Sequence, residues 1–113
     1  MDVTFRNEKL ARIFNSEKEL VREYGSENAK KIKLRMAVLT VATCLEEVSH
    51  RPPERRHELS GNRKGQFAVD LKHPQRLIFE ANHKPLPRKI DGGLDLKKVT
   101  AITIVEVEDY HNG

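Results

Sequence analysis

The fold is decided by the stretch Gln66–Phe79, which reads QFAVDLKHPQRLIF. Its first part, Gln66–Leu71, alternates between apolar and more polar residues, with the period of two that is typical of a β-strand. His73 and Pro74 then supply a turn, and Arg76–Phe79 supplies a second apolar strand. The stretch therefore predicts a β-meander.

Upstream of this stretch, the sequence predicts helices that end before Pro52 and Pro53. Ser16 and Glu19 have the spacing of a capping box, so one helix is expected from there to Gly25. Ser26 can cap a longer helix, and the two are expected to form an antiparallel hairpin. An apolar stripe along the longer helix is predicted to be buried, and the cations beside it are predicted to face solvent. The stripe consists of Leu34, Val38, Val41, Leu45 and Val48 and is widened by Ile32, Met36 and Leu39, and the cations are Lys30, Lys31, Lys33 and Arg35.

Downstream of the stretch, a loop and one more strand are expected. Asn82–Leu94 contains two prolines and two glycines, which predicts a loop or an extended hairpin tip. Val99–Val107 is apolar on both faces, as expected of an interior strand that is covered on each side. Helices followed by strands indicate the α+β fold class, and 113 residues fit a single domain over 1–113.

Basic residues gather in the second half of the chain. Overall, Lys and Arg outnumber Asp and Glu by 21 to 17. Between Arg51 and Arg76 there are seven basic and three acidic residues, a surplus of four that equals the net charge of the whole chain, +4. Local clustering of this kind favours a phosphate-bearing partner such as a nucleic acid.

The sequence also indicates a compartment. Cys44 is the one cysteine, so an intramolecular disulfide is excluded. The N-terminal residues show no apolar run typical of a signal peptide, and no apolar segment approaches the roughly 20 residues that span a bilayer. A reducing cytoplasm without membrane insertion is therefore expected.

The side chains that could carry chemistry suit RNA cleavage without a metal. One cysteine and five scattered histidines never adopt metal-ligand spacing, and no glycine-rich phosphate loop is present, so neither a metal nor a cofactor is expected. In metal-free cleavage the ribose 2′-hydroxyl loses a proton, Arg or Lys stabilises the phosphorane, and the leaving 5′-oxygen gains a proton. Histidine can transfer protons near neutral pH, and tyrosine can stack on a base. Candidates by residue type are His57, Lys64, Arg76, Tyr110 and His111.

Four segments occur in an order known from one protein family. They are Tyr24-Gly25 followed by the Lys-rich helix with Leu34-Arg35, then His57–Phe67, then Arg76–Phe79, and finally Asp109-Tyr110-His111. Together they resemble the RelE/HigB superfamily of type II toxin-antitoxin toxins, in its plasmid maintenance system killer protein branch. The resemblance covers nearly the whole chain.

The resemblance implies a RelE-like fold, in which a two-helix hairpin packs on a twisted, mainly antiparallel β-sheet. It implies a toxin that cleaves mRNA in the ribosomal A site without a metal and leaves a 2′,3′-cyclic phosphate. It also implies a cognate helix-turn-helix antitoxin of the HigA type. That antitoxin would cover or distort the site in a toxin-antitoxin hetero-oligomer and repress the operon.

Site residues are carried over by position. Arg76 would hold the scissile phosphate, and His57, Tyr110 and His111 would complete the catalytic group. Which histidine is the general base and which the acid is left open, and Asp109 would only support its neighbours. RNA or ribosome binding is expected of five basic residues: Arg55, Arg56, Arg63, Lys64 and Lys72.

Two other functions are left open by the sequence. A gyrase-directed poison of the ParE type would share the fold without cutting RNA, although the terminal Tyr110-His111 argues against it. A non-catalytic RNA-binding or regulatory module would keep the basic face and lack the chemistry.

Overall fold

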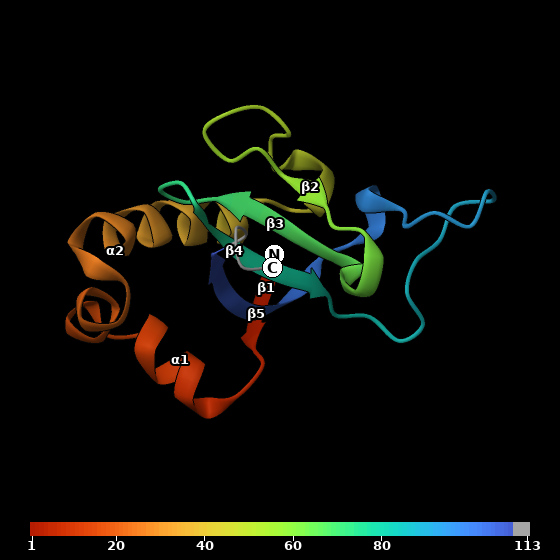
Figure 1. Ribbon diagram of the computed structural model, residues 1–113. Coiled ribbons are helices and arrows are strands. Elements are labelled where there is room, and N and C mark those ends of the chain that lie inside the picture. Colours follow the sequence, from red (N-terminus) through yellow and green to blue (C-terminus); the bar gives the residue numbers. More distant parts are fainter. Residues whose placement is uncertain (110–113) are drawn as a thin grey trace.

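The computed structural model describes residues 1–109, which form one five-stranded sheet with helices against one of its faces (Figure 1). The order of strands in the sheet is β1-β5-β4-β3-β2. Strands β2 to β5 pair antiparallel in chain order, and β1 joins β5 in parallel. The strands are β1 (Asp2–Phe5), β2 (His57–Glu58), β3 (Gln66–Asp70), β4 (Gln75–Ala81) and β5 (Ala101–Asp109). The α+β class and the predicted meander are thus confirmed.

The helical part consists of two α-helices that pack on each other, α1 (Glu8–Phe14) and α2 (Glu17–Val41). The Ser16 hydroxyl accepts a hydrogen bond from the Glu19 amide at 3.2 Å, which confirms the predicted cap. The predicted helix end at Gly25 and the predicted antiparallel hairpin are confirmed, because Gly25 interrupts α2 with a non-helical backbone and Glu17 of the first part pairs with Lys33 of the second at 3.0 Å. Three short 3₁₀ turns lie at Leu45–Glu47, Gly61–Arg63 and Leu96–Lys98.

Gly25 kinks α2 where the sequence predicted a helix end. Its φ of 84° and ψ of 161° lie in a region that residues with a Cβ atom rarely enter. The two predicted helices therefore lie before and after Gly25 and share the label α2, and the short helix α1 precedes them.

We expect Gly25→Ala to lower the free energy of unfolding by about 1–3 kcal/mol, because alanine strains that backbone conformation. No atom lies within 4 Å of the position that a Cβ would take, so the cost comes from the backbone alone. Urea unfolding of the variant measures the loss. Lys18→Ala, at an exposed position of the same helix, is the control and should change stability by less than about 0.5 kcal/mol. An equal, small effect of both substitutions would contradict the strain.

The main core lies between the helices and one face of the sheet. Phe67 and Phe79 are fully buried there and stack with ring centroids 6.0 Å apart. Ile32 and Leu39 of α2 cover them, while Ile102 extends the layer onto β5. The opposite face holds a smaller apolar cluster of Leu59, Ala68, Ile78 and Val105, to which no α-helix contributes. Most of that face is therefore left for polar side chains.

The apolar stripe predicted to be buried is confirmed at Ile32, Leu39, Leu45 and Val48 and is wrong at Leu34 and Val41. Leu34 is 57% and Val41 81% exposed, and α2 ends at Val41 instead of continuing to Val48. The buried face of α2 consists of Leu20, Asn28, Ala29, Ile32, Arg35 and Leu39. The helix has two apolar stripes, and the sheet takes the one that carries Ile32 and Leu39.

Arg35 was predicted to face solvent, and this is wrong because the side chain is buried at 5% exposure. Its Nε donates to the main-chain oxygen of Asp70 at 2.6 Å. Asn28, which is also buried, accepts from the Lys72 amide at 2.9 Å through Oδ1 and donates to Gln75 through Nδ2. Both side chains satisfy polar main-chain groups at the β3–β4 turn, as buried polar groups must.

The later segments follow the sequence closely. The turn between β3 and β4 lies at His73-Pro74, and the segment 82–94 consists of a loop over 82–87 and a hairpin that the bridge between Arg88 and Leu94 closes. Strand β5 is an interior strand, as predicted, although it runs two residues later than expected and helices cover only one of its faces instead of both. Within residues 1–109, no helix is both long and apolar enough to cross a membrane.

Candidate functional site

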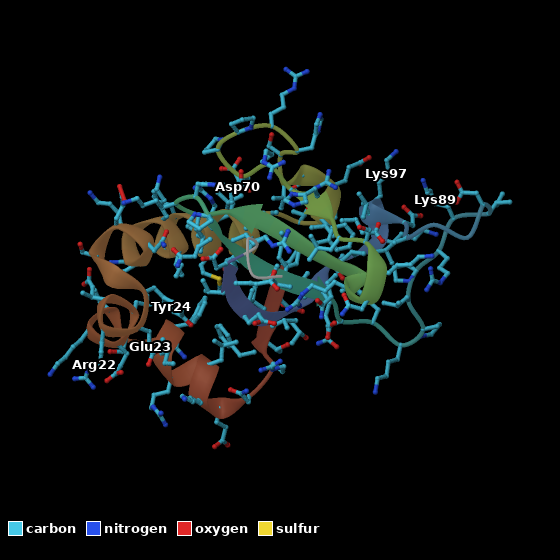
Figure 2. All side chains as sticks on the ribbon, viewed as in Figure 1. Arg22, Glu23, Tyr24, Asp70, Lys89 and Lys97 are labelled. Carbon is cyan, nitrogen blue, oxygen red and sulfur yellow. The ribbon has the colours of Figure 1, made fainter. Side chains whose placement is uncertain are left out.

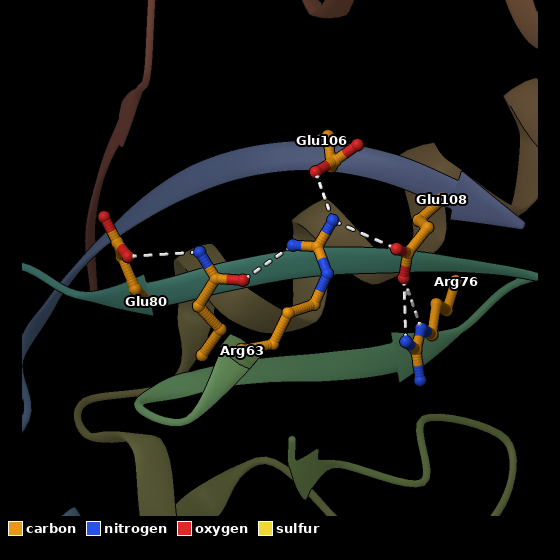
Figure 3. A network of polar contacts seen from close by, with 6 residues as sticks. Arg63, Arg76, Glu80, Glu106 and Glu108 are labelled. Atoms are coloured by element: carbon orange, nitrogen blue, oxygen red, sulfur yellow. Dashed lines mark hydrogen bonds and ion pairs between the residues drawn. The ribbon is translucent and has the colours of Figure 1, made fainter. Parts of the chain in front are cut away.

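The face of the sheet turned away from the helices carries a network of charged side chains (Figure 3). Arg76 on β4 lies directly opposite Glu108 on β5, and Ile78 lies opposite Glu106. Since side chains on one strand alternate between faces, Arg76, Ile78 and Glu80 share this face. The strand register therefore brings one cation and two carboxylates together from segments about 30 residues apart.

Arg76 and Glu108 form the best-protected pair of the network. Arg76 donates from Nε at 3.0 Å and from Nη2 at 2.7 Å to the same carboxylate oxygen, Oε2 of Glu108. Their side chains are only 16% and 12% exposed. A guanidinium held in this way is oriented toward the open face and is already partly desolvated.

Arg63 adds a second guanidinium from the 3₁₀ turn Gly61–Arg63. Its Nη2 lies 2.6 Å from Glu106 and 3.0 Å from Glu108, so Glu108 bridges the two arginines. The hydrogen bond that Arg63 donates to Glu106 raises the pKa of Arg63 above its already high value, which fixes the positive charge. Two cations and two carboxylates thus share a small area of the sheet.

The network extends in both directions along the sheet. Nη1 of Arg63 donates to Oε1 of Gln66 at 2.7 Å, and Nε2 of Gln66 lies 3.5 Å from Glu80. At the other end Arg55 pairs with Asp70 at 2.7 Å. Cations and carboxylates alternate across this face, so it is not the uniformly basic surface that the charge cluster in the sequence indicated.

His57 begins the edge strand β2 and lies opposite Ala68, which belongs to the apolar cluster of the same open face. Its Nδ1 is 2.8 Å from the main-chain oxygen of Arg55. That contact fixes Nδ1 as the protonated nitrogen of a neutral ring and leaves Nε2 as the acceptor. The histidine therefore shares the face with Arg76, and its catalytic role stays a prediction.

The other predicted site residues are distributed differently. Tyr110 and His111 lie outside the described residues, and Asp109 ends β5 opposite Gln75. Lys64 is exposed beside Arg63. Two of the five cations assigned to RNA stand apart from the network: Arg56 donates to the Val48 oxygen at 2.8 Å, and Lys72 pairs with Glu27 of α2 at 2.8 Å.

The pKa shifts of these two cations, Arg56 and Lys72, also have causes outside the network. Burial lowers the pKa of Arg56, whose guanidinium donates to the main-chain oxygen of Val48. The hydrogen bond to Glu27 raises the pKa of Lys72. Both cations already have protein partners, although their assignment to RNA stays untested.

Glu106 and Glu108 were not named from the sequence. The one signal available was the alternation of glutamate with valine at the end of β5, where Val105 and Val107 flank Glu106. Polar residues that alternate with apolar ones along a strand indicate that one face of the strand is open to solvent or ligand. Among the described residues, no group of three or more His, Cys, Asp or Glu side chains could hold a metal ion.

Chemically, the network offers the groups that phosphate chemistry needs. The guanidiniums can bind two phosphate oxygens each, and the carboxylates and His57 can exchange protons. Because Glu108 bridges both arginines, an incoming phosphate would compete with this carboxylate for Arg76.

Comparison with known proteins identifies the fold. No protein-family model matches the chain, and no curated protein matches it in sequence. A chain of the solved YoeB-YefM complex from Staphylococcus aureus is similar in structure, with a TM-score of 0.55 and 12% sequence identity. The match covers 96% of this chain and 94% of that chain. The predicted fold of two helices packed on a mainly antiparallel sheet is thus confirmed over nearly the whole length, and at this identity the likeness concerns the fold alone.

Proposed function

We propose that this protein is the toxin of a type II toxin-antitoxin module and acts in the cytoplasm as a ribosome-dependent mRNA endoribonuclease of the RelE/HigB type. The proposal rests on the position of Arg76, which Glu108 holds on the open face of the sheet beside Arg63. The structural likeness to a chain of the YoeB-YefM complex supports it.

In the proposed reaction the RNA 2′-oxygen attacks the adjacent phosphorus. The bond from the 2′-oxygen to phosphorus forms and the bond from phosphorus to the 5′-oxygen breaks, which leaves a 2′,3′-cyclic phosphate and a free 5′-hydroxyl. Arg76 binds the phosphate oxygens and stabilises the charge that develops on them. One group acts as the general base and takes the proton of the 2′-hydroxyl, and a second acts as the general acid and donates a proton to the 5′-oxygen. The candidates for these two roles are His57, Glu106, Glu108, Tyr110 and His111.

Expression of the chain alone in a bacterial host tests this function. Growth should stop, and mapping of RNA 5′ ends should find cuts within translated reading frames that disappear when translation initiation is blocked. DNA breaks with intact mRNA would replace the proposal by the gyrase poison. Growth without either lesion would favour the non-catalytic RNA-binding module.

We propose in addition a partner, a cognate antitoxin with a HigA-like helix-turn-helix domain. The outer face of α2 offers a surface for it, defined here by Lys30, Lys31, Leu34, Ala37, Val38 and Val41. Its C-terminal part is apolar and borders a hollow of about 440 Å³, while its N-terminal part carries lysines. Exposed apolar side chains next to cations fit an amphipathic, acidic segment of the antitoxin.

Val41→Asp should weaken antitoxin binding by about 30-fold or more, because a carboxylate would replace an exposed apolar anchor and repel an acidic segment. The affinity of the purified variant for the cognate antitoxin measures the loss. Ile90→Asp is the matched control, since Ile90 is equally branched and fully exposed at the far hairpin. Equal affinities of the two variants would remove this face of α2 from the interface.

A further inference from the structure

The hairpin 82–94 and the sheet enclose a groove that the reaction described above does not use. It measures about 740 Å³, which is within the size range of small-molecule sites. We call it the hairpin groove. Its walls include Glu58, Lys64, Glu80, Leu86, Arg88 and Leu94.

The hairpin that forms the outer wall is closed by its own hydrogen bonds. The Lys89 amide donates to the Gly93 oxygen at 2.7 Å, and the Gly92 amide donates to Lys89 at 2.9 Å. Nη1 of Arg88 donates to the Gly92 oxygen at 3.0 Å, which uses this cation inside the hairpin. The wall is therefore built by specific contacts, and one of the two cations of the groove is engaged by the main chain.

The chemistry of the groove suits a nucleobase better than a phosphate. Three carboxylates, on Glu58, Glu80 and Asp91, outnumber its two cations, which disfavours an anion. Carboxylates accept hydrogen bonds from the exocyclic amino groups of bases, as Glu and Asp do with cytosine N4. Leu86, which is 38% exposed, offers an apolar surface for the face of a base.

Glu80 connects the groove to the site on the open face. Gln66 lies 3.5 Å from Glu80 and accepts from Arg63, which pairs with Glu108 beside Arg76 (Figure 3). Glu80 and Arg76 lie four residues apart on β4, roughly 13 Å, so a nucleobase in the groove would belong to a nucleotide that flanks a phosphate bound at Arg76. Figure 2 shows Lys89 of the hairpin far from Glu23 and Tyr24 of α2, so the groove and the helices occupy separate parts of the molecule.

We propose that the hairpin groove binds a nucleobase of the RNA that flanks the scissile phosphate and selects bases with an exocyclic amino group over uracil. This inference rests on the proposed function, because it assumes an RNA substrate. Glu80 acts as the acceptor for the amino group, and Leu86 contacts the plane of the base. Uracil presents a carbonyl oxygen where cytosine has its amine, so Glu80 would repel it.

The test compares cytosine and uracil directly. The probes are fluorescent hexamers of 2′-O-methyl oligo(C) and oligo(U), which have the same size and cannot be cleaved because the attacking hydroxyl is blocked. The unmodified chain should bind oligo(C) about tenfold more tightly than oligo(U). Glu80→Gln should bring this ratio close to one, because the amide can also donate to uracil. Glu23→Gln removes the same charge on α2 and should keep the ratio.

The outcomes separate the two proposals. The groove assignment would be overturned if the unmodified chain bound both hexamers with equal affinity. It would also be overturned if Glu80→Gln kept the full preference for oligo(C) while unfolding like Glu23→Gln. A preference that depends on Glu80 supports the groove even if expression of the chain leaves cellular mRNA intact. In that case the nuclease proposal alone would fall.

Discussion

Replacing Arg76 by alanine is expected to reduce mRNA cleavage by about 10²- to 10³-fold, the loss typical when one preorganised donor to a developing oxyanion is removed. Arg76 presents a guanidinium on the open face, oriented by two hydrogen bonds to Glu108. Alanine removes the donor and the charge together. The measurement is the rate at which mRNA 5′ ends appear after induction at matched protein levels.

Lysine at the same position separates charge from geometry. Arg76→Lys keeps the cation but cannot bind two phosphate oxygens in the plane of a guanidinium, so an intermediate rate is expected. The fold should tolerate both variants, because Glu108 keeps its contact with Arg63 at 3.0 Å and is not left as an unpaired buried charge. We expect a loss of about 1–3 kcal/mol in the free energy of unfolding. Full cleavage by folded Arg76→Ala would remove Arg76 from the mechanism.

The sheet could be predicted from the sequence because its signals are local. Alternation in Gln66–Leu71, the turn at His73-Pro74 and the apolar run Arg76–Phe79 each lie within a few residues, and the structure has β3, the turn and β4 at these places. The cap at Ser16 is equally local, since donor and acceptor are three residues apart.

The orientation of α2 could not be predicted in the same way. The helix carries one apolar stripe through Leu34 and Val41 and another through Ile32 and Leu39, and periodicity alone does not say which one faces the sheet. The choice depends on Arg35 and Asn28, which reach the β3–β4 turn only once the tertiary structure exists. A buried arginine cannot be recognised from its neighbours in the sequence.

In the candidate site, too, local sequence signals could be recognised, whereas contacts between distant residues could not. Arg76 was named from the sequence, but its partner Glu108 is 32 residues away and lies beside it only through the register of β4 and β5. The hairpin groove likewise requires the segment 82–94 to fold next to Glu58 and Glu80. Residue types could indicate phosphate chemistry, whereas the pairing of cations with carboxylates required strand register.

Phe79→Ala is expected to lower the free energy of unfolding by about 3–5 kcal/mol, the usual cost of deleting a buried aromatic ring. Phe79 is 0% exposed and stacks on Phe67 at the centre of the core. Phe5→Ala is the matched control, because it deletes the same atoms from a partly buried ring that contacts Phe14. Its cost should stay below about 2 kcal/mol in urea unfolding.

Phe79 also tests whether the two faces of β4 act independently. Its side chain points into the core, whereas Arg76 on the same strand points to the open face. Below its unfolding midpoint Phe79→Ala should therefore cleave mRNA at nearly the rate of the unmodified chain, and it should lose activity only as the unfolded fraction grows. Arg76→Ala should stay inactive at every temperature. Equal stability losses for Phe79→Ala and Phe5→Ala would contradict the position of the core. A cleavage defect in fully folded Phe79→Ala would show instead that the packing beneath β4 determines the orientation of Arg76.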